Sequence, residues 1–109
     1  MSQFFPEPAE FGQHTIFGNV RIRTCAGQHV QFSLVDIPPG GVVDEHCHVN
    51  EQMGLVLEGE MDFTIGGETR RLRPGDVFRI PGGVTHSVLA GEKPIKLLDV
   101  FYPIRDEYR

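Results

Sequence analysis

The stretch GGVVDEHCHVNEQMGLVLEG, residues 40–59, decides the fold of this chain and points to its chemistry. A β-type run is expected at 42–48, and alternate side chains of a strand point to the same face. His46 and His48 would therefore share a face, about 6.6 Å apart along the strand, so that both imidazoles can reach one ion. Gln52 continues the same alternation. The stretch therefore indicates part of a metal site.

A second histidine element lies farther along the chain, in GDVFRIPGGVTHSVLA at 75–90. Here His86 follows the corner formed by residues 81–83. A four-ligand site needs such a distant element, because sequence neighbours alone cannot surround an ion. Cys47, between the two histidines of the first stretch, points to the opposite face and is excluded from the metal.

Short β-type runs continue on both sides of these stretches, at 16–24, 29–37, 42–48, 52–58, 60–65, 68–73, 76–80, 85–90 and 95–102. Turns rich in glycine and proline separate the runs, and Gly66-Gly67 joins two of them as a tight hairpin would. No window has a sustained 3.6-residue apolar period. We predict an all-β antiparallel sandwich or closed barrel. An irregular arm is expected at 1–14 and a single domain at 15–109.

Composition excludes several classes of partner. The 109 residues suit one compact domain, and ten Lys and Arg against fifteen Asp and Glu give a net charge of −5. That balance argues against a nucleic-acid or anionic membrane surface. No apolar run approaches the roughly 18–20 residues that a membrane span needs, and the start does not look like a secretory signal. Cys25 and Cys47 are expected to be free thiols, which suits a cytoplasmic protein.

The two stretches resemble the two motifs of the cupin family. The first motif has the form G-x5-H-x-H-x3–4-E-x6-G, and its positions are occupied by Gly40, His46, His48, Gln52 and Gly59. The second has the form G-x5-P-x-G-x2-H-x3-N, and its positions are occupied by Gly75, Pro81, Gly83 and His86. The resemblance implies a double-stranded β-helix, or jelly-roll, barrel that holds one divalent metal ion (Ni, Zn, Mn or Fe) and commonly forms a homodimer.

Two positions depart from the cupin pattern: Gln52 replaces the usual Glu, and Ala90 replaces Asn. The residues leave two interpretations of Gln52 open. Either the site has lost its metal, or the amide oxygen serves as a neutral ligand and leaves the ion its full charge, which strengthens it as a Lewis acid toward an anionic substrate. Glu51 does not replace it, because on a regular strand it faces away from the histidines.

The ending LDVFYPIRDEYR, residues 98–109, narrows the resemblance. A DVF-x-P-x-R ending after a first motif with Gln is similar to the KdgF group of cupins, which handles unsaturated monouronates released by pectin and alginate lyases. This similarity implies a metal held by His46, His48, Gln52 and His86, with Asp99, Phe101 and Arg105 as further active-site residues. Asp99 and Phe101 share a strand face. Without the resemblance, Asp99 and Arg105 would be interpreted as a surface ion pair.

Three functions are compatible with these residues. The first is a metal-dependent isomerase that converts 4,5-unsaturated monouronates to linear 5-keto-4-deoxyuronate by ring opening and ketonisation. There Asp99 would move the proton, Arg105 would hold the substrate carboxylate, and Phe101 would supply an apolar wall. The second is an iron-dependent small-molecule dioxygenase, although such centres usually carry a carboxylate ligand. The third is a non-catalytic module that binds a sugar or a metal.

The remaining notable residues lie outside the motifs. His14 and His29 fit neither motif, and we expect them at the surface or the barrel rim. The N-terminal arm carries Phe4, Phe5 and Phe11, which either cover one end of the barrel or pack on a partner subunit. A small barrel gains buried surface by pairing, which favours a homodimer.

Overall fold

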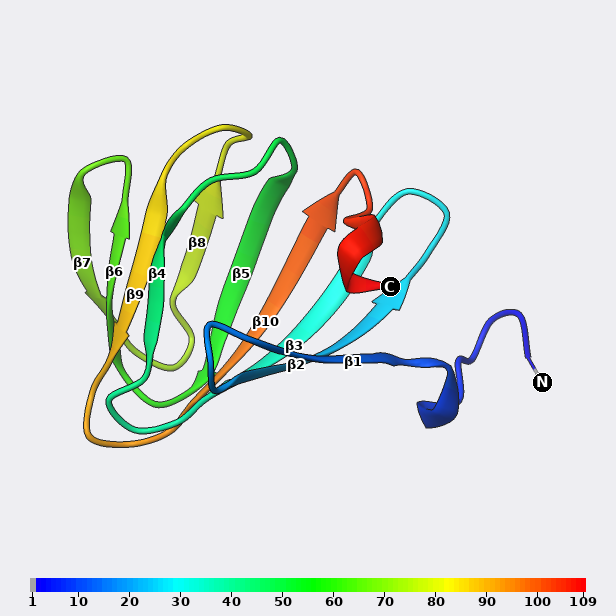
Figure 1. Ribbon diagram of the computed structural model, residues 1–109, viewed down its shortest axis with the longest axis horizontal. Coiled ribbons are helices and arrows are strands. Elements are labelled where there is room, and N and C mark those ends of the chain that lie inside the picture. Colours follow the sequence, from blue (N-terminus) through cyan, green and yellow to red (C-terminus); the bar gives the residue numbers. More distant parts are fainter. Residues whose placement is uncertain (1) are drawn as a thin grey trace.

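The computed structural model describes residues 2–109 and is built almost entirely of β-strands (Figure 1). The strands in chain order are β1 (Gly12–Ile16), β2 (Val20–Ala26), β3 (Gln31–Ile37), β4 (Val42–His46), β5 (Glu51–Glu58), β6 (Met61–Ile65), β7 (Glu68–Leu72), β8 (Val77–Ile80), β9 (His86–Ala90) and β10 (Ile95–Tyr102). Short 3-10 helices lie near the two ends, η1 (Pro8–Glu10) and η2 (Asp106–Tyr108). No helix in the described part of the chain is long and apolar enough to cross a membrane.

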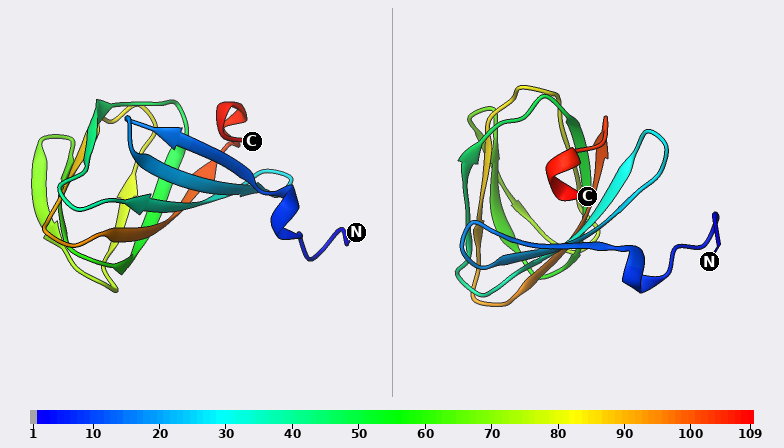
Figure 2. Two further views of the ribbon diagram at one scale, coloured as in Figure 1. Left: turned by 60° about the horizontal axis from the view of Figure 1, so that its bottom comes forward. Right: turned by 45° about the vertical axis from the view of Figure 1, so that its right-hand side comes forward.

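The strands form two antiparallel sheets that face each other (Figure 2). One sheet has six strands in the order β1-β2-β3-β10-β5-β8, and the other has four in the order β4-β9-β6-β7. From β3 onward the chain passes from one sheet to the other at every connection except the β6–β7 hairpin. This winding is that of a jelly-roll barrel, which confirms the predicted all-β fold class.

The core lies between the two sheets because alternate residues of each strand point inward. Along β10, for example, Ile95 and Leu97 are buried while Lys96 between them is exposed. The apolar core consists of Val20, Ile22, Val35, Ile37, Val56, Met61, Phe63, Phe78, Ile80, Val88, Ala90, Ile95 and Leu97. Polar side chains are also buried in the described part of the chain: Thr24, Gln31, Ser33, Asn50, Gln52, His86 and Asp99. Burying polar groups costs free energy unless they find partners. Nε2 of His86 and Oδ1 of Asp99 have no hydrogen-bond partner, so these two residues mark a functional site.

The strand prediction was wrong in its first segment. The expected strand at 16–24 is instead the end of β1 and most of β2, which form a hairpin. The chain reverses at Phe17 and Gly18, whose φ angles of 50° and 84° are typical of a tight turn. The Gly18-Asn19 pair was the turn signal available in the sequence. β1 starts at Gly12, so the last residues of the expected irregular arm at 1–14 lie in a strand.

The N-terminal arm projects away from its own barrel (Figures 1 and 2). Phe4 and Phe5 are among the most exposed apolar side chains, with 78% and 76% of their surface accessible. The structure therefore does not show them covering an end of their own barrel, which was one of the two possibilities left by the sequence.

After β10 the chain turns and η2 stands before the barrel opening, in the right-hand view of Figure 2. This C-terminal segment, residues 103–109, carries Arg105 and Tyr108, both of which line the cavity between the sheets. The segment therefore closes the end of the barrel at which the polar residues are buried.

Candidate metal centre

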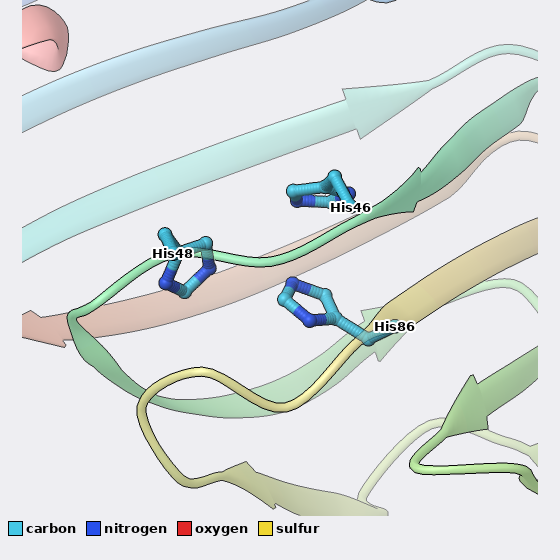
Figure 3. A group of neighbouring side chains, drawn as sticks. All are labelled: His46, His48 and His86. Atoms are coloured by element: carbon cyan, nitrogen blue, oxygen red, sulfur yellow. The ribbon is translucent and has the colours of Figure 1, made fainter.

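Three histidines from separate parts of the fold meet inside the barrel (Figure 3). His46 ends β4, His48 lies in the loop after it, and His86 starts β9. Each offers one nitrogen, and these three atoms lie within 4.8 Å of one another. The ring centroids of His46 and His86 are 4.3 Å apart, and those of His48 and His86 are 4.9 Å apart. This is a group that could hold a metal ion.

The histidines converge for a different reason from the one predicted. The expected strand at 42–48 was too long, because β4 ends at His46 and His48 belongs to the loop. His46 lies opposite His86 in the β4–β9 pairing, after a register irregularity that begins at Val43. The loop then turns back and presents His48 to the same space. Cys47 is exposed between them.

The hydrogen bonds of the three imidazoles orient their second nitrogens toward the centre. Each Nδ1 lies beside a backbone carbonyl oxygen: that of Asp44 for His46 (2.8 Å), Asn50 for His48 (2.9 Å) and Val84 for His86 (2.9 Å). A carbonyl can only accept, so each Nδ1 must carry the proton and donate it. Each Nε2 is then left with a lone pair, which is the form that binds a metal.

Gln52 completes the group from the neighbouring strand β5. Its Oε1 lies 3.0 Å from Nε2 of His48, and its side chain is buried. Since that Nε2 carries no proton, two acceptors face each other, an arrangement that a cation between them would stabilise. Nε2 of His86 is likewise buried without a hydrogen-bond partner. These two unsatisfied contacts fit a divalent ion bound by three imidazoles and an amide oxygen.

Burial favours the neutral form of two of the imidazoles, those of His48 and His86. It lowers the pKa of His86 to about 4, with smaller contributions from His46, His48 and Arg105. Burial also lowers the pKa of His48, and the positive charge of Arg105 adds to that effect. At neutral pH both rings are therefore in the unprotonated form that a metal requires.

Asp99 lies deep in the barrel, on β10, and not at the surface. The alternative of a surface ion pair with Arg105 is wrong, because Asp99 is buried and Arg105 pairs with Glu107. Burial raises the pKa of Asp99 to about 7, while a hydrogen bond from the Gln52 side chain and the charge of Arg105 act in the opposite direction. Its Oδ1 has no hydrogen-bond partner. The carboxyl group is thus poised to exchange a proton near neutral pH.

Arg105 enters the site from the C-terminal segment. Its side chain is only 11% exposed, and its Nε donates to Glu107 at 2.9 Å. The guanidinium carbon lies 5.2 Å from the ring centroid of Phe101 and 4.0 Å from that of Tyr108. The ion pair with Glu107 engages Nε, so neither terminal nitrogen pairs with a carboxylate among the residues described. A guanidinium held in this way can bind a carboxylate.

The structure gathers the predicted residues and adds others. One narrow cavity of about 50 Å³ is lined by His46, Gln52, His86, Asp99, Phe101 and Arg105. Phe17, whose ring lies 5.1 Å from His46, and Tyr108 also line it, and sequence reasoning missed both. The Phe17-Gly18 turn and the aromatic residue after Arg105 were the only local signals. A cavity of this size suits an ion and a few water molecules.

The other residues considered in the sequence lie outside the site. His29 is exposed, and Nε2 of His14 lies 3.1 Å from the backbone oxygen of Arg109. Glu51 is exposed and faces away from the histidines, as its place in the strand predicted. Cys25 is half-buried and free.

Known proteins resemble this chain in both its fold and its sequence motifs. The family described as "Cupin domain" matches residues 33–101, which include the metal centre, Asp99 and Phe101. The chain belongs to the cupin family. This cupin is 29% identical over 75 residues to the pectin degradation protein KdgF of Dickeya dadantii, a match that covers 68% of each chain. It is 28% identical to the solved structure of KdgF from Halomonas sp., with a TM-score of 0.83 over 94% of this cupin and 96% of that chain.

A different relative carries another activity in its name. This cupin is 37% identical over 75 residues to the cupin-domain-containing oxidoreductase srdB of Neurospora crassa, a match that covers 66% of this cupin. It spans only 38% of the length of that relative. The comparisons thus confirm the resemblance to cupins, KdgF included, and make an enzymatic activity plausible for the fold.

Proposed function

We propose that this cupin is a metal-dependent enzyme that converts 4,5-unsaturated monouronates to linear 5-keto-4-deoxyuronate. The observation that carries the proposal is the buried carboxyl of Asp99, which has an unpartnered oxygen and shares one cavity with the histidine centre and Arg105. An acid–base group, a cation site and an anion partner are the parts that this reaction needs. The similarity to KdgF, a protein of pectin degradation, supports the choice of substrate.

The reaction rearranges bonds without changing composition. Opening the hemiacetal breaks the bond between C1 and the ring oxygen, leaving an aldehyde at C1 and an enol hydroxyl at C5. Loss of the enol proton and protonation of C4 then give the 5-keto product. No electrons are gained or lost, so the reaction needs proton transfer and stabilisation of enolate charge, and no redox cofactor.

Each side chain has a distinct part in this proposal. Asp99, with a pKa of about 7, would accept one proton and deliver another because both of its forms are populated near neutral pH. Arg105 would pair with the substrate carboxylate through its terminal nitrogens, and Phe101 would form the apolar wall beside it. A divalent ion held by His46, His48, Gln52 and His86 would supply Lewis acidity toward substrate oxygens. The cavity is smaller than a monosaccharide, so only the reacting atoms would enter it.

The experiment uses unsaturated monouronate made with a lyase, and follows the loss of enol absorbance with protein loaded in turn with Ni, Zn, Mn and Fe. We expect at least one loaded form to accelerate the loss, and a chelator to abolish the acceleration. No acceleration over the spontaneous rate by any loaded form would overturn the proposal.

Substitutions then test the role proposed for each residue. Asp99→Asn keeps the shape of the side chain but removes the base, so activity should fall by about 10²–10⁴-fold with metal content unchanged. Asp62→Asn makes the same chemical change on β6, where Asp62 pairs with Arg71 at the surface, and should leave activity unchanged. Arg105→Ala should raise KM more than it lowers kcat. Wild-type activity in Asp99→Asn would remove Asp99 from the mechanism.

The similarity to the Neurospora oxidoreductase favours a second candidate, an iron-dependent dioxygenase. A dioxygenase would consume oxygen when loaded with iron, and an oxygen electrode would detect this consumption. The proposed isomerase would consume none. A binding module, the third possibility, would bind a uronate in calorimetry without any turnover. The two assays together separate the three functions.

A further inference from the structure

The C-terminal segment that carries Arg105 is fastened by polar side chains from other elements. Asn50 donates from Nδ2 to the backbone oxygen of Pro103 at 2.7 Å, and the hydroxyl of Thr24 donates to the backbone oxygen of Tyr108. Gln31, at the start of β3, binds the backbone of Arg105 itself. All three of these side chains are buried. Their hydrogen bonds go to main-chain atoms, so they hold the course of the segment and do not depend on its side chains.

Gln31 binds Arg105 at two points. The backbone N–H of Arg105 donates to Oε1 of Gln31 at 2.9 Å, and Nε2 of Gln31 donates to the backbone oxygen of Arg105 at 3.2 Å. Because one partner is a donor and the other an acceptor, the orientation of the amide is fixed. Gln31 has no exposed surface, so water cannot replace either bond.

From this backbone position the side chain of Arg105 lines the cavity. Gln31 lies opposite Phe101 in the β3–β10 pairing, and its two hydrogen bonds hold the backbone of Arg105 near the end of β10, the strand that carries Asp99 and Phe101. The guanidinium then lies between the rings of Phe101 and Tyr108, with Nε on Glu107. Its charge acts on Asp99, His48 and His86.

We infer that Gln31 is the positioning residue for Arg105: its side-chain amide holds the backbone of Arg105 where the guanidinium faces the cavity. This inference rests on the proposed role of Arg105 as the partner of the substrate carboxylate. Gln31 touches no reacting atom in this scheme and acts only through Arg105. The inference predicts that loss of the Gln31 amide weakens substrate binding, as loss of the Arg105 guanidinium should.

The first test removes both hydrogen bonds with little change in volume. Gln31→Met should raise KM for the unsaturated monouronate by about 10- to 100-fold, with a smaller fall in kcat and with metal content unchanged. Gln31→Glu keeps an acceptor for the Arg105 N–H and should give a smaller rise. Unchanged KM in folded Gln31→Met would overturn the inference.

The control and the double variant separate positioning from general destabilisation. Ile95→Ala removes core packing at the opposite end of β10, at a residue that does not line the cavity, and should lower stability while leaving KM unchanged. In an Arg105→Ala background, Gln31→Met should add no further rise in KM, because it acts only through Arg105. An equal rise in that background would show that Gln31 acts by another route, and would contradict the inference.

A readout without substrate keeps the inference testable if the proposed function fails. In ¹H–¹⁵N spectra, the Nε–H of Arg105 should exchange slowly with water because it is bound to Glu107 and mostly buried. Gln31→Met should speed this exchange and move the signal toward those of exposed arginines, whereas Ile95→Ala should not. A wild-type protein without turnover would count against the function alone. An Arg105 signal unchanged in Gln31→Met would count against the positioning role alone.

Discussion

The three Nε2 atoms of the centre face one another because backbone carbonyls already accept the proton of each Nδ1. At the scale of single residues, these backbone carbonyls determine which nitrogen of each histidine can bind a metal. An imidazole fixed in that tautomer presents a lone pair to the cavity, and three such lone pairs within 4.8 Å repel one another without a cation. The backbone carbonyls therefore select the tautomer that a metal ligand needs.

Removing one ligand tests this organisation. His48→Ala should lower the bound metal well below one equivalent per chain, measured by elemental analysis after dialysis, while the far-ultraviolet circular dichroism stays that of a β protein. His29→Ala changes an exposed histidine outside the group and should keep full metal content. Full occupancy in His48→Ala would show that His48 is not a ligand.

The buried Asp99 should make stability depend on pH. Burial raises its pKa from 3.8 to about 7, so between these values the folded chain holds a proton that the unfolded chain releases. The contribution of Asp99 to folding therefore falls as pH rises from 3.8 to about 7, and the loss is complete above that. His86, whose pKa is lowered from 6.5 to about 4, acts in the opposite sense, since its contribution falls as pH falls from 6.5.

Asp99→Asn isolates the first of these effects, because His86 is common to both proteins. Without metal, the variant should be more stable than wild type at pH 8 by on the order of 1–3 kcal/mol, since it cannot bury a charge. The difference should shrink toward pH 4, where the folded wild type holds the carboxyl in its neutral form and the unfolded chain has regained about half of its proton. Urea unfolding at the two pH values measures it, with Asp62→Asn as the surface control. An unchanged difference between pH 4 and pH 8 would contradict the raised pKa.

At the scale of elements, the packing of β5 on β8 depends on a missing side chain. Gly54 pairs with Phe78, and a Cβ added at Gly54 would lie 2.0 Å from Cζ of that ring. The ring cannot move freely, because its centroid lies 4.5 Å from that of Phe63 in the core. The absence of a side chain at Gly54 thus allows the two sheets to close around the apolar end of the barrel.

Gly54→Ala should therefore destabilise the protein by about 1–3 kcal/mol, the usual cost of overpacking. Gly27→Ala is the matched control, because a Cβ there would meet its nearest atom at 3.4 Å, an ordinary contact. Urea unfolding of both variants measures the effect. Equal midpoints for the two variants would show that the Phe78 ring adjusts without strain.

The elements also show how far the sequence predicts this molecule. β10 has the predicted bounds of 95–102, and the Gly66-Gly67 hairpin joins β6 and β7 as expected, because local alternation and turn residues determine both. The histidine centre was predictable because the spacing in its two motifs is local. The roles of Gln31, Glu107 and Tyr108 were not, because they depend on how the segment after β10 folds back. Gln31 and Arg105 are 74 positions apart, and no local pattern reports their contact.

At the scale of the whole molecule, the outer face of the six-stranded sheet carries an apolar patch on its central strands. Val100 on β10 lies between Phe32 on β3 and Met53 on β5, and all three point outward. A second outward row, in the same order across the sheet, consists of Leu34, Leu98, Leu55 and Val77. Phe32 and Met53 are 52% and 46% exposed, so nothing in the described chain covers this face. Such a patch favours association with a partner.

We propose that a second copy of this chain covers the face and forms a homodimer. The N-terminal arm supports this choice, because it reaches away from its own barrel and presents Phe4 and Phe5 to solvent. In a two-fold pair, the projecting arm and the apolar face of one chain can each bury apolar surface against the other chain. Neither feature needs a partner of different chemistry.

Light scattering at micromolar concentration tests the dimer. We expect about twice the chain mass of 12.2 kDa. Met53→Glu places a charge at the centre of the face and should give the monomer, whereas Thr69→Glu makes a similar change on exposed β7, in the other sheet, and should leave the dimer intact. The metal content should be the same in all three proteins, because the four proposed ligands, His46, His48, Gln52 and His86, belong to one chain. A wild-type mass of 12.2 kDa would refute the dimer and show that a second copy of the chain does not cover the outer face.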